Sequence, residues 1–403
     1  MNPFSRIILD WYAQNGRDLP WRRTKDPYAV WLSEIILQQT RIVQGKAYWE
    51  RFMERFPTVE DLASASEDEV LRLWEGLGYY SRARNLHAAA RQIVARGGFP
   101  DTLEGIRSLK GVGDYTAAAI GSICFGLPAA VVDGNVYRVL ARHFGIPTPV
   151  GTTQAKKEFT ALAQKLLPED ASAFNQGMMD FGALQCTPQN PDCAACPLLS
   201  SCNAYKTGRT ELLPVKKPAT AVQERRFNYI YVRCNGYTAI RKRGKGDIWQ
   251  GLYEPLATPL PVVGNYFSQG FAKNQFPTTS TQPARNSETL PVSENYFSGR
   301  DPKNQFSETS TKPAHKEGSQ PSEENYFSQG FAKNQFSSDS TSPTRIKAQV
   351  KHQLTHRTLI CDFYRWEPME RPELPDGYFW IKETELDQYA KPRLFELLLE
   401  AIS

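Results

Sequence analysis

The sequence has no apolar run that approaches the roughly 20 residues of a membrane-spanning helix. Its mean hydropathy is −0.50. The short apolar stretch near the N-terminus is followed closely by acidic and basic residues and by no small-residue cleavage site. We therefore expect neither a membrane protein nor a secretory signal peptide.

A large excess of one charge is also missing. Lys and Arg number 48 against 43 Asp and Glu, a formal net charge of +5, which permits a nucleic-acid partner without requiring one. Only seven cysteines occur, and four of them lie within residues 186–202. A disulfide framework would spread paired cysteines along a short chain, so this cluster indicates a metal site in a cytosolic protein.

Strand signals are scarce in residues 1–210, where apolar residues recur at helical spacing between prolines and glycines. This pattern predicts an all-α region with one or two cores. The predicted helical segments are Tyr28–Phe56, Val59–Glu75, Ser81–Ala95, Tyr115–Phe125, Gly134–Phe144 and Thr153–Leu167.

The sequence pattern changes from about Ala221, where short runs of β-branched and aromatic residues begin. Asn235-Gly236 between the first two runs predicts a hairpin. The runs are followed by an amphipathic helix, so we expect a second, α+β domain. The predicted strands and helix are 227–234, 237–243, 359–366, 378–382 and 391–402.

A repeat interrupts this second domain: the stretch 265–276 recurs at 295–306 and 325–336, with a period of 30 residues. Between 264 and 345 the only branched aliphatic residues are Leu290 and Val292. Such a segment cannot bury enough apolar area to offset its ordering entropy. We predict a disordered insertion over 264–345; the alternative is an aromatic repeat that recruits a partner.

The cysteine cluster has the spacing Cys186-x6-Cys193-x2-Cys196-x5-Cys202. Zinc sites usually combine two CxxC-type pairs, and here only one is present. The uneven gaps suit a loop around an iron–sulfur cubane, in which each iron takes one thiolate. The alternatives are a zinc site or unligated thiols.

Two further patterns indicate DNA binding and acid–base chemistry. Gly111 and Gly113 form a short turn that opens a helix, either a helix-hairpin-helix that meets a DNA phosphate or a simple turn. Asp133 starts a helix, as an N-cap or as a carboxylate aimed into a cleft. Glu34 is a lone acid in an apolar helical stretch. Either it is buried, which would raise its pKa, or it lies on the solvent-exposed edge of the helix.

These motifs occur in order with several others, and together they resemble the MutY-type adenine DNA glycosylases of the helix-hairpin-helix, or endonuclease III, superfamily. The resemblance covers about 1–210 and extends more weakly to a Nudix-like C-terminal domain. The motifs that carry it, besides the cysteine loop, are LPWR (19–22), VWLSEIILQQT (30–40), LWEGLGYYSRARNLH (73–87), LKGVGDYTAAAI (109–120), VVDGNVYRVLAR (131–142), FNQGMMDFGALQC (174–186), GDIWQGLYEPL (246–256) and VKHQLTHR (350–357).

The resemblance implies a mainly α glycosylase domain over 1–205 that includes a 4Fe-4S loop on the four clustered cysteines. A linker would cover 206–222, and an α+β, Nudix-like lesion-recognition domain would cover 223–403. No acidic Nudix hydrolase helix is visible, so we expect this second domain to bind and not to hydrolyse.

The implied activity is base-excision repair, in which adenine mispaired with 8-oxoguanine or guanine in double-stranded DNA is flipped out and hydrolytically removed. Glu34 would protonate the adenine, and Asp133 would stabilise the oxocarbenium-like sugar. Tyr115 and Asn135 would orient this site. A protonatable acid beside an ionised one is the pair that such chemistry needs.

The resemblance also implies DNA contacts outside the acids. Tyr79 would wedge beside the lesion, and Gln39 and Thr40 would line the opposite base. The remaining implied substrate and DNA contacts are Trp21, Arg22, Leu77, Gly111, Gly113, Thr355 and His356. Leu354 and Thr355 depart from the Phe and Ser common in the family's 8-oxoguanine-reading loop. We expect a monomer of the bacterial cytoplasm that associates with the nucleoid when bound to DNA.

Position 115 separates this interpretation from an endonuclease III-like glycosylase/lyase for oxidised pyrimidines, which carries a nucleophilic lysine there. Tyr115 cannot form a Schiff base, so we predict a monofunctional hydrolase. A binding-only mismatch sensor would not need both Glu34 and Asp133. A zinc-dependent DNA-binding regulator is the third alternative.

Overall fold

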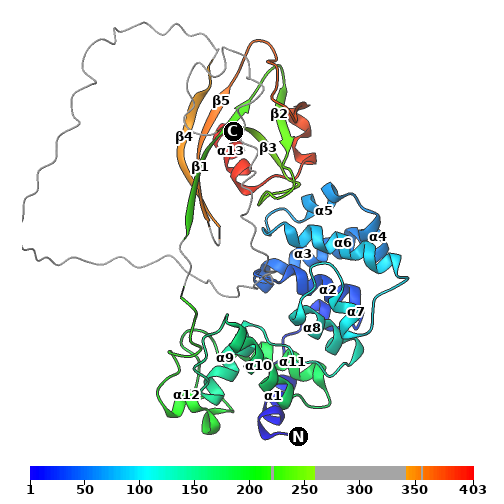
Figure 1. Cartoon of the computed structure of the whole chain (residues 1–403), viewed down its shortest axis with the longest axis vertical. Coiled ribbons are helices and arrows are strands. Elements are labelled where there is room, and N and C mark those ends of the chain that lie inside the picture. The colour runs from blue at the N-terminus through cyan, green and yellow to red at the C-terminus, as the bar shows by residue number, and fades with distance from the viewer. Residues whose placement is uncertain (219–221, 259–341, 355–356) are drawn as a thin grey trace, which may run out of the picture.

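The computed structural model describes residues 1–218, 222–258, 342–354 and 357–403. Most of the predicted insertion, residues 264–341, lies outside the described residues, as do Thr355 and His356. Within the described ranges, no helix is long and apolar enough to cross a membrane. Figure 1 shows a helical region that holds the N-terminus and, beyond it, a sheet region that holds the C-terminus.

The helical region is built almost entirely from α-helices, as the sequence predicts. Its elements are α1 (Pro3–Asn15), η1 (Pro20–Arg22), α2 (Pro27–Ile36), α3 (Ile42–Arg55), α4 (Val59–Ser64), α5 (Glu67–Leu73), α6 (Ser81–Ala95), α7 (Leu103–Arg107), α8 (Asp114–Phe125), α9 (Gly134–Phe144), α10 (Thr153–Leu166), α11 (Ala171–Leu184), η2 (Leu199–Ser201) and α12 (Asn203–Lys206).

Two of the long predicted helices are each split in the structure. The 28–56 segment breaks between α2 and α3, where Gln39 has a left-handed φ of 59° that an α-helix cannot contain. The 59–75 segment breaks between α4 and α5, because the Ser66 side chain accepts a hydrogen bond from the Glu69 backbone N–H at 3.2 Å and starts a new helix. Hydrophobic periodicity alone does not detect such a break.

The buried side chains of the helical region belong to two hydrophobic cores. One contains Trp31 of α2 and Ala117 of α8, and the other contains Val30 of α2 and Ala118 of α8. The helices α2 and α8 therefore lie between the two cores, each presenting one face to each core. This position places their polar side chains at the junction of the two halves.

The sheet region contains six strands in the order β4-β5-β1-β3-β2-β6, in which β1 and β5 are parallel and the other neighbours are antiparallel. The helix α13 packs against β1 and β4. The elements are β1 (Gln223–Val232), β2 (Tyr237–Lys242), β3 (Tyr253–Thr258), β4 (Thr344–Gln353), β5 (Arg357–Trp366), β6 (Tyr378–Lys382), η4 (Glu383–Gln388) and α13 (Arg393–Ile402).

The predicted hairpin is only partly right. Asn235 and Gly236 adopt the left-handed φ values of 51° and 75° that a tight turn needs, and the backbones of Cys234 and Tyr237 exchange hydrogen bonds of 2.9 and 3.0 Å. The strands then separate, because β3 pairs with both β1 and β2 and lies between them. A turn motif predicts the local geometry but not which strand inserts later.

Two strands have no counterpart in the sequence prediction. The strand β3 contains Pro255, which lowers strand propensity. The strand β4 is an edge strand that is mostly exposed, so it lacks the apolar alternation that would identify it. Thr344 and Arg345, the last residues of the predicted insertion, already belong to β4.

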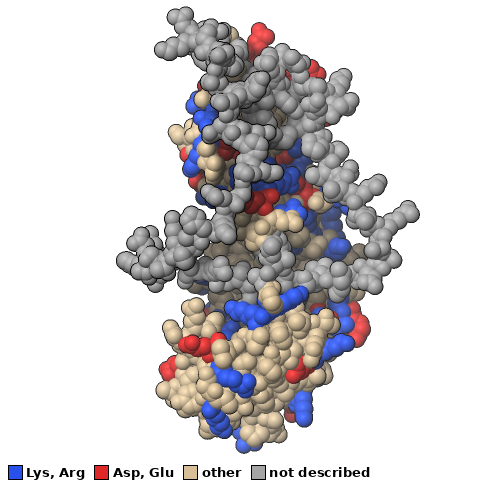
Figure 2. Space-filling model, turned by 60° about the vertical axis from the view of Figure 1, so that its left-hand side comes forward, with Lys and Arg blue, Asp and Glu red and all other residues tan. Residues whose placement is uncertain are grey.

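The helical and sheet regions contact one another directly. Arg84 of α6 donates to the Gln250 carbonyl at 2.6 Å, and the Tyr253 hydroxyl donates to Asp68 at 3.0 Å. Leu71 and Leu252 belong to the same hydrophobic core. On the face drawn in Figure 2, the visible Lys and Arg side chains form several small groups, in keeping with the small net charge.

Candidate active site

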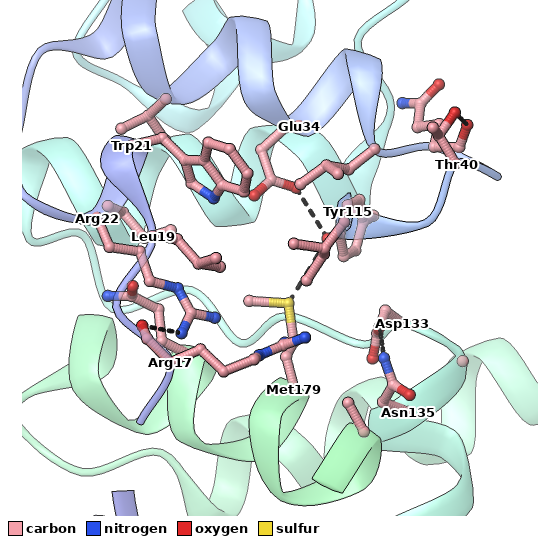
Figure 3. A pocket seen from close by; sticks show the side chains of 18 of the residues that line it. Arg17, Leu19, Trp21, Arg22, Glu34, Thr40, Tyr115, Asp133, Asn135 and Met179 are labelled. Carbon is pink, nitrogen blue, oxygen red and sulfur yellow. Dashed lines mark hydrogen bonds between the residues drawn. The ribbon is translucent and has the colours of Figure 1, made fainter. Parts of the chain in front are cut away.

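A cavity of about 380 Å³ lies where α2, α8, α9 and α11 meet the segment before α2 (Figure 3). This volume lies within the range of small-molecule sites. Its lining combines apolar side chains with a few charged and amide groups. The lining residues include Arg17, Leu19, Trp21, Arg22, Glu34, Leu37, Gln38, Thr40, Ile42, Tyr115, Asp133, Asn135, Arg138, Gln176 and Met179.

Glu34 points into this cavity from the last turn of α2 (Figure 3). It is only 9% exposed, so it does not lie on a wet edge of the helix. Its Oε2 accepts a hydrogen bond from the Tyr115 hydroxyl at 2.8 Å. Burial raises the pKa of Glu34 to about 7, although the Tyr115 hydrogen bond and the Arg22 charge oppose the shift. Near neutral pH, Glu34 can therefore hold and release a proton.

Tyr115 comes from the first turn of α8, 81 residues from Glu34 in sequence. Its hydroxyl also lies 3.6 Å from the Met179 Sδ of α11, with the hydroxyl as donor. The side chain thus spans the cavity between α2 and α11. This geometry lets Tyr115 fix the direction in which Glu34 points.

Asp133 lines the cavity at the start of α9 (Figure 3). Its Oδ1 accepts from the Val136 backbone N–H at 2.8 Å, and its Oδ2 accepts from the Asn135 amide at 2.7 Å. Asp133 is therefore both an N-cap and a cavity carboxylate, so both sequence alternatives apply. Burial raises the pKa of Asp133, and the hydrogen bonds from Val136 and Asn135 oppose the shift. Reasoning from the helix start alone misses this desolvation.

A close helix approach positions Asn135. A Cβ on Gly182 of α11 would lie 2.6 Å from the Asn135 Cβ, so only glycine fits there. The Asn135 Oδ1 in turn accepts from Arg138 at 2.8 Å. Asn135 therefore connects the Arg138 guanidinium to the Asp133 carboxylate through two hydrogen bonds.

The sequence prediction missed a buried ion-pair group behind the cavity. Asp180 of α11 is 0% exposed and accepts hydrogen bonds from Arg17 at 2.8 Å and from Arg22 at 2.6 Å. Burial opposes ionisation, but the Arg22 and Arg17 hydrogen bonds lower the pKa of Asp180 below its usual value. Asp180 is the lone acid of an apolar helix, and this is the signal that drew attention to Glu34.

Other predicted residues divide between the cavity and its surroundings. Trp21, Arg22 and Thr40 line the cavity with the two acids. Gln39 is exposed and Tyr79 is 47% exposed, and neither lines the cavity. Both residues have left-handed φ values. Leu77, beside Tyr79, is buried.

The predicted hairpin joins α7 to α8. Gly111 has a φ of 77°, and a Cβ there would lie 2.6 Å from the Asn85 Cβ, so the turn requires glycine on two grounds. Gly113 is the N-cap of α8. The structure therefore has the helix-hairpin-helix arrangement that the sequence predicts.

The four clustered cysteines follow α11 in one loop and are all free, half-buried thiols. Arg142 donates to the Cys186 Sγ at 3.4 Å. Burial raises the pKa of Cys193, and the nearby Cys186 and Cys202 raise it further, so these thiols lie within electrostatic reach. Among the described residues, no three His, Cys, Asp or Glu side chains converge as around one metal ion. A cubane spreads its four ligands over four irons and does not require that convergence.

Comparison with known proteins identifies the family. Residues 32–169 match the model of the HhH-GPD superfamily base excision DNA repair protein. The adenine DNA glycosylase of Buchnera aphidicola subsp. Schizaphis graminum is 37% identical over 254 residues, or 62% of this chain and 73% of that protein. The Homo sapiens adenine DNA glycosylase is 46% identical over 222 residues, which span 52% of this chain and 41% of that protein.

A thermostable thymine-DNA glycosylase of known structure is 32% identical, and the alignment covers 51% of this chain and 95% of that chain with a TM-score of 0.47. The family assignment depends on the sequence relatives, since the match with the Buchnera protein covers more than two thirds of that protein. The chain belongs to the adenine DNA glycosylase family of base-excision repair proteins.

Proposed function

We propose that this chain is a monofunctional glycosylase that flips out and hydrolytically removes adenine mispaired with 8-oxoguanine or guanine in double-stranded DNA. The observation that carries the proposal is Glu34, whose pKa is about 7 in a cavity that it shares with Asp133. Flipping costs least at a mispair, which favours mispaired adenine over paired adenine.

The two acids divide the chemistry. Protonated Glu34 donates a proton to a ring nitrogen of adenine, and the electron pair of the breaking N-glycosidic bond stays with the base. The Asp133 carboxylate stabilises the oxocarbenium-like sugar. Water adds to this sugar and loses one proton, which returns to the carboxylate of Glu34. Tyr115 and Asn135 hold these acids in place through the 2.8 and 2.7 Å hydrogen bonds.

The structure offers no support for the lyase alternative. Among the described residues that line the cavity, none is a lysine. A Schiff base with the sugar needs an amine, and the matching position holds Tyr115. Hydrolysis therefore accounts best for this set of side chains.

We further propose that Cys186, Cys193, Cys196 and Cys202 hold a 4Fe-4S cluster. Four free thiols in one loop and the Arg142 contact to Cys186 support it. When bound, the cluster supplies a rigid anchor for this loop and no chemistry to the cavity. A purified protein that is colourless and holds zinc instead of iron and sulfide would contradict this assignment.

The sheet region is proposed to be a Nudix-like lesion-recognition domain. Its mixed six-stranded sheet with the α13 helix supports this assignment. In this proposal Thr355 and His356, which lie outside the described residues, would read 8-oxoguanine. The protein would act as a monomer in the bacterial cytoplasm and on the nucleoid.

The test is a single-turnover assay on duplexes with adenine opposite 8-oxoguanine, guanine or thymine. We expect rapid release opposite 8-oxoguanine and guanine and little opposite thymine, without borohydride-trappable strand cleavage. Equal rates on the three duplexes would contradict mispair specificity. A trapped enzyme–DNA adduct would contradict the monofunctional mechanism.

A further inference from the structure

Two loops of the helical region contain backbone conformations that L-residues rarely adopt. Gln39, after the end of α2, has a φ of 59°, and Tyr79, before α6, has a φ of 46°. Left-handed backbone at a non-glycine residue is unfavourable and persists only where the surroundings impose it. Contacts elsewhere must therefore hold both loops in place.

A single guanidinium, that of Arg82 in the first turn of α6, donates hydrogen bonds to both loops. Its Nη1 donates to the carbonyls of Ile35 at 2.8 Å, Ile36 at 3.2 Å and Gln38 at 2.7 Å. Its Nη2 donates to the carbonyls of Leu77 at 3.2 Å and Gly78 at 3.3 Å.

The first group of acceptors lies at the end of α2. The last carbonyls of a helix have no partner within the helix, and a cation there is favoured by the helix dipole. Glu34 lies just before Ile35, and Gln38 and Thr40 line the cavity. The hydrogen bonds from Arg82 therefore hold the end of α2 and the start of the loop expected to face the opposite base.

The second group of acceptors lies in the loop that carries Tyr79. The Arg82 Cζ also lies 5.8 Å from the centre of the Tyr79 ring and 5.0 Å from that of Trp74. The planar guanidinium of arginine donates from two terminal nitrogens and so can bond to both loops at once. Lysine has a single ammonium nitrogen and cannot reproduce this set of hydrogen bonds.

We propose that Arg82 is a positioning residue that fixes the Gln39 loop and the Tyr79 loop relative to one another and so sets the selectivity for the mispair. This role rests on the proposed function, in which Tyr79 wedges beside the lesion and Gln39 and Thr40 line the opposite base. Arg82 acts through these residues and not on the reacting atoms.

The test compares Arg82→Lys with Arg91→Lys. Arg91 lies on the same helix and donates to the carbonyls of Ala63 at 3.1 Å and Ala65 at 3.5 Å, away from the cavity. Single-turnover adenine release is measured against enzyme concentration on duplexes with adenine opposite 8-oxoguanine, guanine and thymine.

For Arg82→Lys we expect the half-saturating concentration to rise at least about tenfold and the selectivity for the preferred mispair over the thymine duplex to fall at least about tenfold. The rate at saturation should stay within about threefold, because Glu34 and Asp133 keep their own partners. Arg91→Lys should leave all three quantities within about twofold of the wild type.

The proposal is overturned if Arg82→Lys leaves the half-saturating concentration and the selectivity unchanged, or if Arg91→Lys changes them equally. If Arg82→Lys does not fold, Arg82→Gln is assayed in the same way, and failure of both variants to fold makes Arg82 a structural residue. The wild-type rates test the proposed function separately: if they show no preference for 8-oxoguanine, the two variants are compared on the duplex from which the wild type releases adenine fastest.

Discussion

The helical region and the sheet region each bury one acid between two arginines. In the helical region Asp180 is 0% exposed and bonded to Arg17 and Arg22. In the sheet region Glu254 is 1% exposed and accepts from Arg241 at 2.8 Å and from Arg243. A buried carboxylate paired in this way holds the elements around it in place.

Glu34 shows what changes when a buried acid has a neutral donor. It is buried to a similar degree, but its hydrogen bond comes from the Tyr115 hydroxyl. Its pKa is raised to about 7, whereas the pKa of Asp180 is lowered. The partner, more than the burial, decides whether an acid supports structure or carries a proton. Arg22 links the two cases, since it binds Asp180 and lines the same cavity as Glu34, whose pKa its charge lowers.

The largest expected effect follows removal of the proton-carrying acid. Glu34→Gln should slow single-turnover adenine release by about 10²- to 10⁴-fold, the usual contribution of a general acid. Binding of the mispaired duplex, measured by titration with the uncleaved duplex, should stay within about twofold. Glu60→Gln on the exposed face of α4 is the control and should change neither quantity. A variant with unimpaired release would refute the role of Glu34.

The next largest effect is a loss of stability when either arginine-paired acid is replaced. Asp180→Asn and Glu254→Gln should each lower the free energy of unfolding, by about 3–5 kcal/mol, because each leaves two arginines without their buried partner. The decrease for Glu254→Gln should lie at the lower end of this range, since Arg243 keeps a 2.7 Å hydrogen bond to Asp247. Denaturant unfolding measures both.

Activity distinguishes these two variants further. Asp180→Asn should also slow adenine release, because Arg17 and Arg22 line the cavity. Glu254→Gln should leave the saturating rate unchanged in the folded protein. If Glu254→Gln slowed adenine release and Asp180→Asn did not, the two ion-pair groups would not differ as the structure indicates.

A pH profile tests the raised pKa of Glu34. This acid is protonated below about pH 7 and loses its proton above it, so the release rate should fall up to tenfold per pH unit on the alkaline side. On the acid side the rate should fall as Asp133 gains a proton, above the usual Asp range because burial raises its pKa. Single-turnover rates across this range measure both limbs. A flat profile through pH 7 would contradict the assignment.

The smallest expected effect follows removal of the Tyr115 hydroxyl, the neutral hydrogen-bond donor to Glu34. Tyr115→Phe removes a hydrogen bond that favours ionised Glu34, so the pKa of Glu34 should rise further and the alkaline limb should move to higher pH. The lost bond is worth about 1 kcal/mol, so the rate near neutral pH should change only a few-fold. The pH profile of the variant gives both values, and a shift to lower pH would contradict the geometry.

Local signals predicted much of the helical region. The bounds of α6 and α9 match the predicted segments. For α9 the Asp133 cap and Gly145 mark the two ends of the apolar periodicity. The same kind of signal placed Glu34 in an apolar helix and Asp133 at a helix start. The break at Gln39 escaped detection because its left-handed backbone leaves no clear mark in the side-chain pattern.

Other features depend on partners that are distant in sequence. Arg82 bonds to five backbone carbonyls, and a carbonyl acceptor has no side-chain signature. The separation of β1 from β2 depends on β3, which pairs with both. The ion-pair group of Asp180 was also missed, because one of its two arginines, Arg17, lies 163 residues earlier in the sequence.

The sequence by itself determined the order of the helices, the hairpin with its two glycines and the two acids, since each depends on neighbours along the chain. Tertiary structure decided that Glu34 and Asp133 share one cavity, and that Glu34 accepts its hydrogen bond from a tyrosine. The physical reason is that a pKa responds to burial and to charges within a few ångströms in space. Those surroundings exist only when helices from distant parts of the chain pack together.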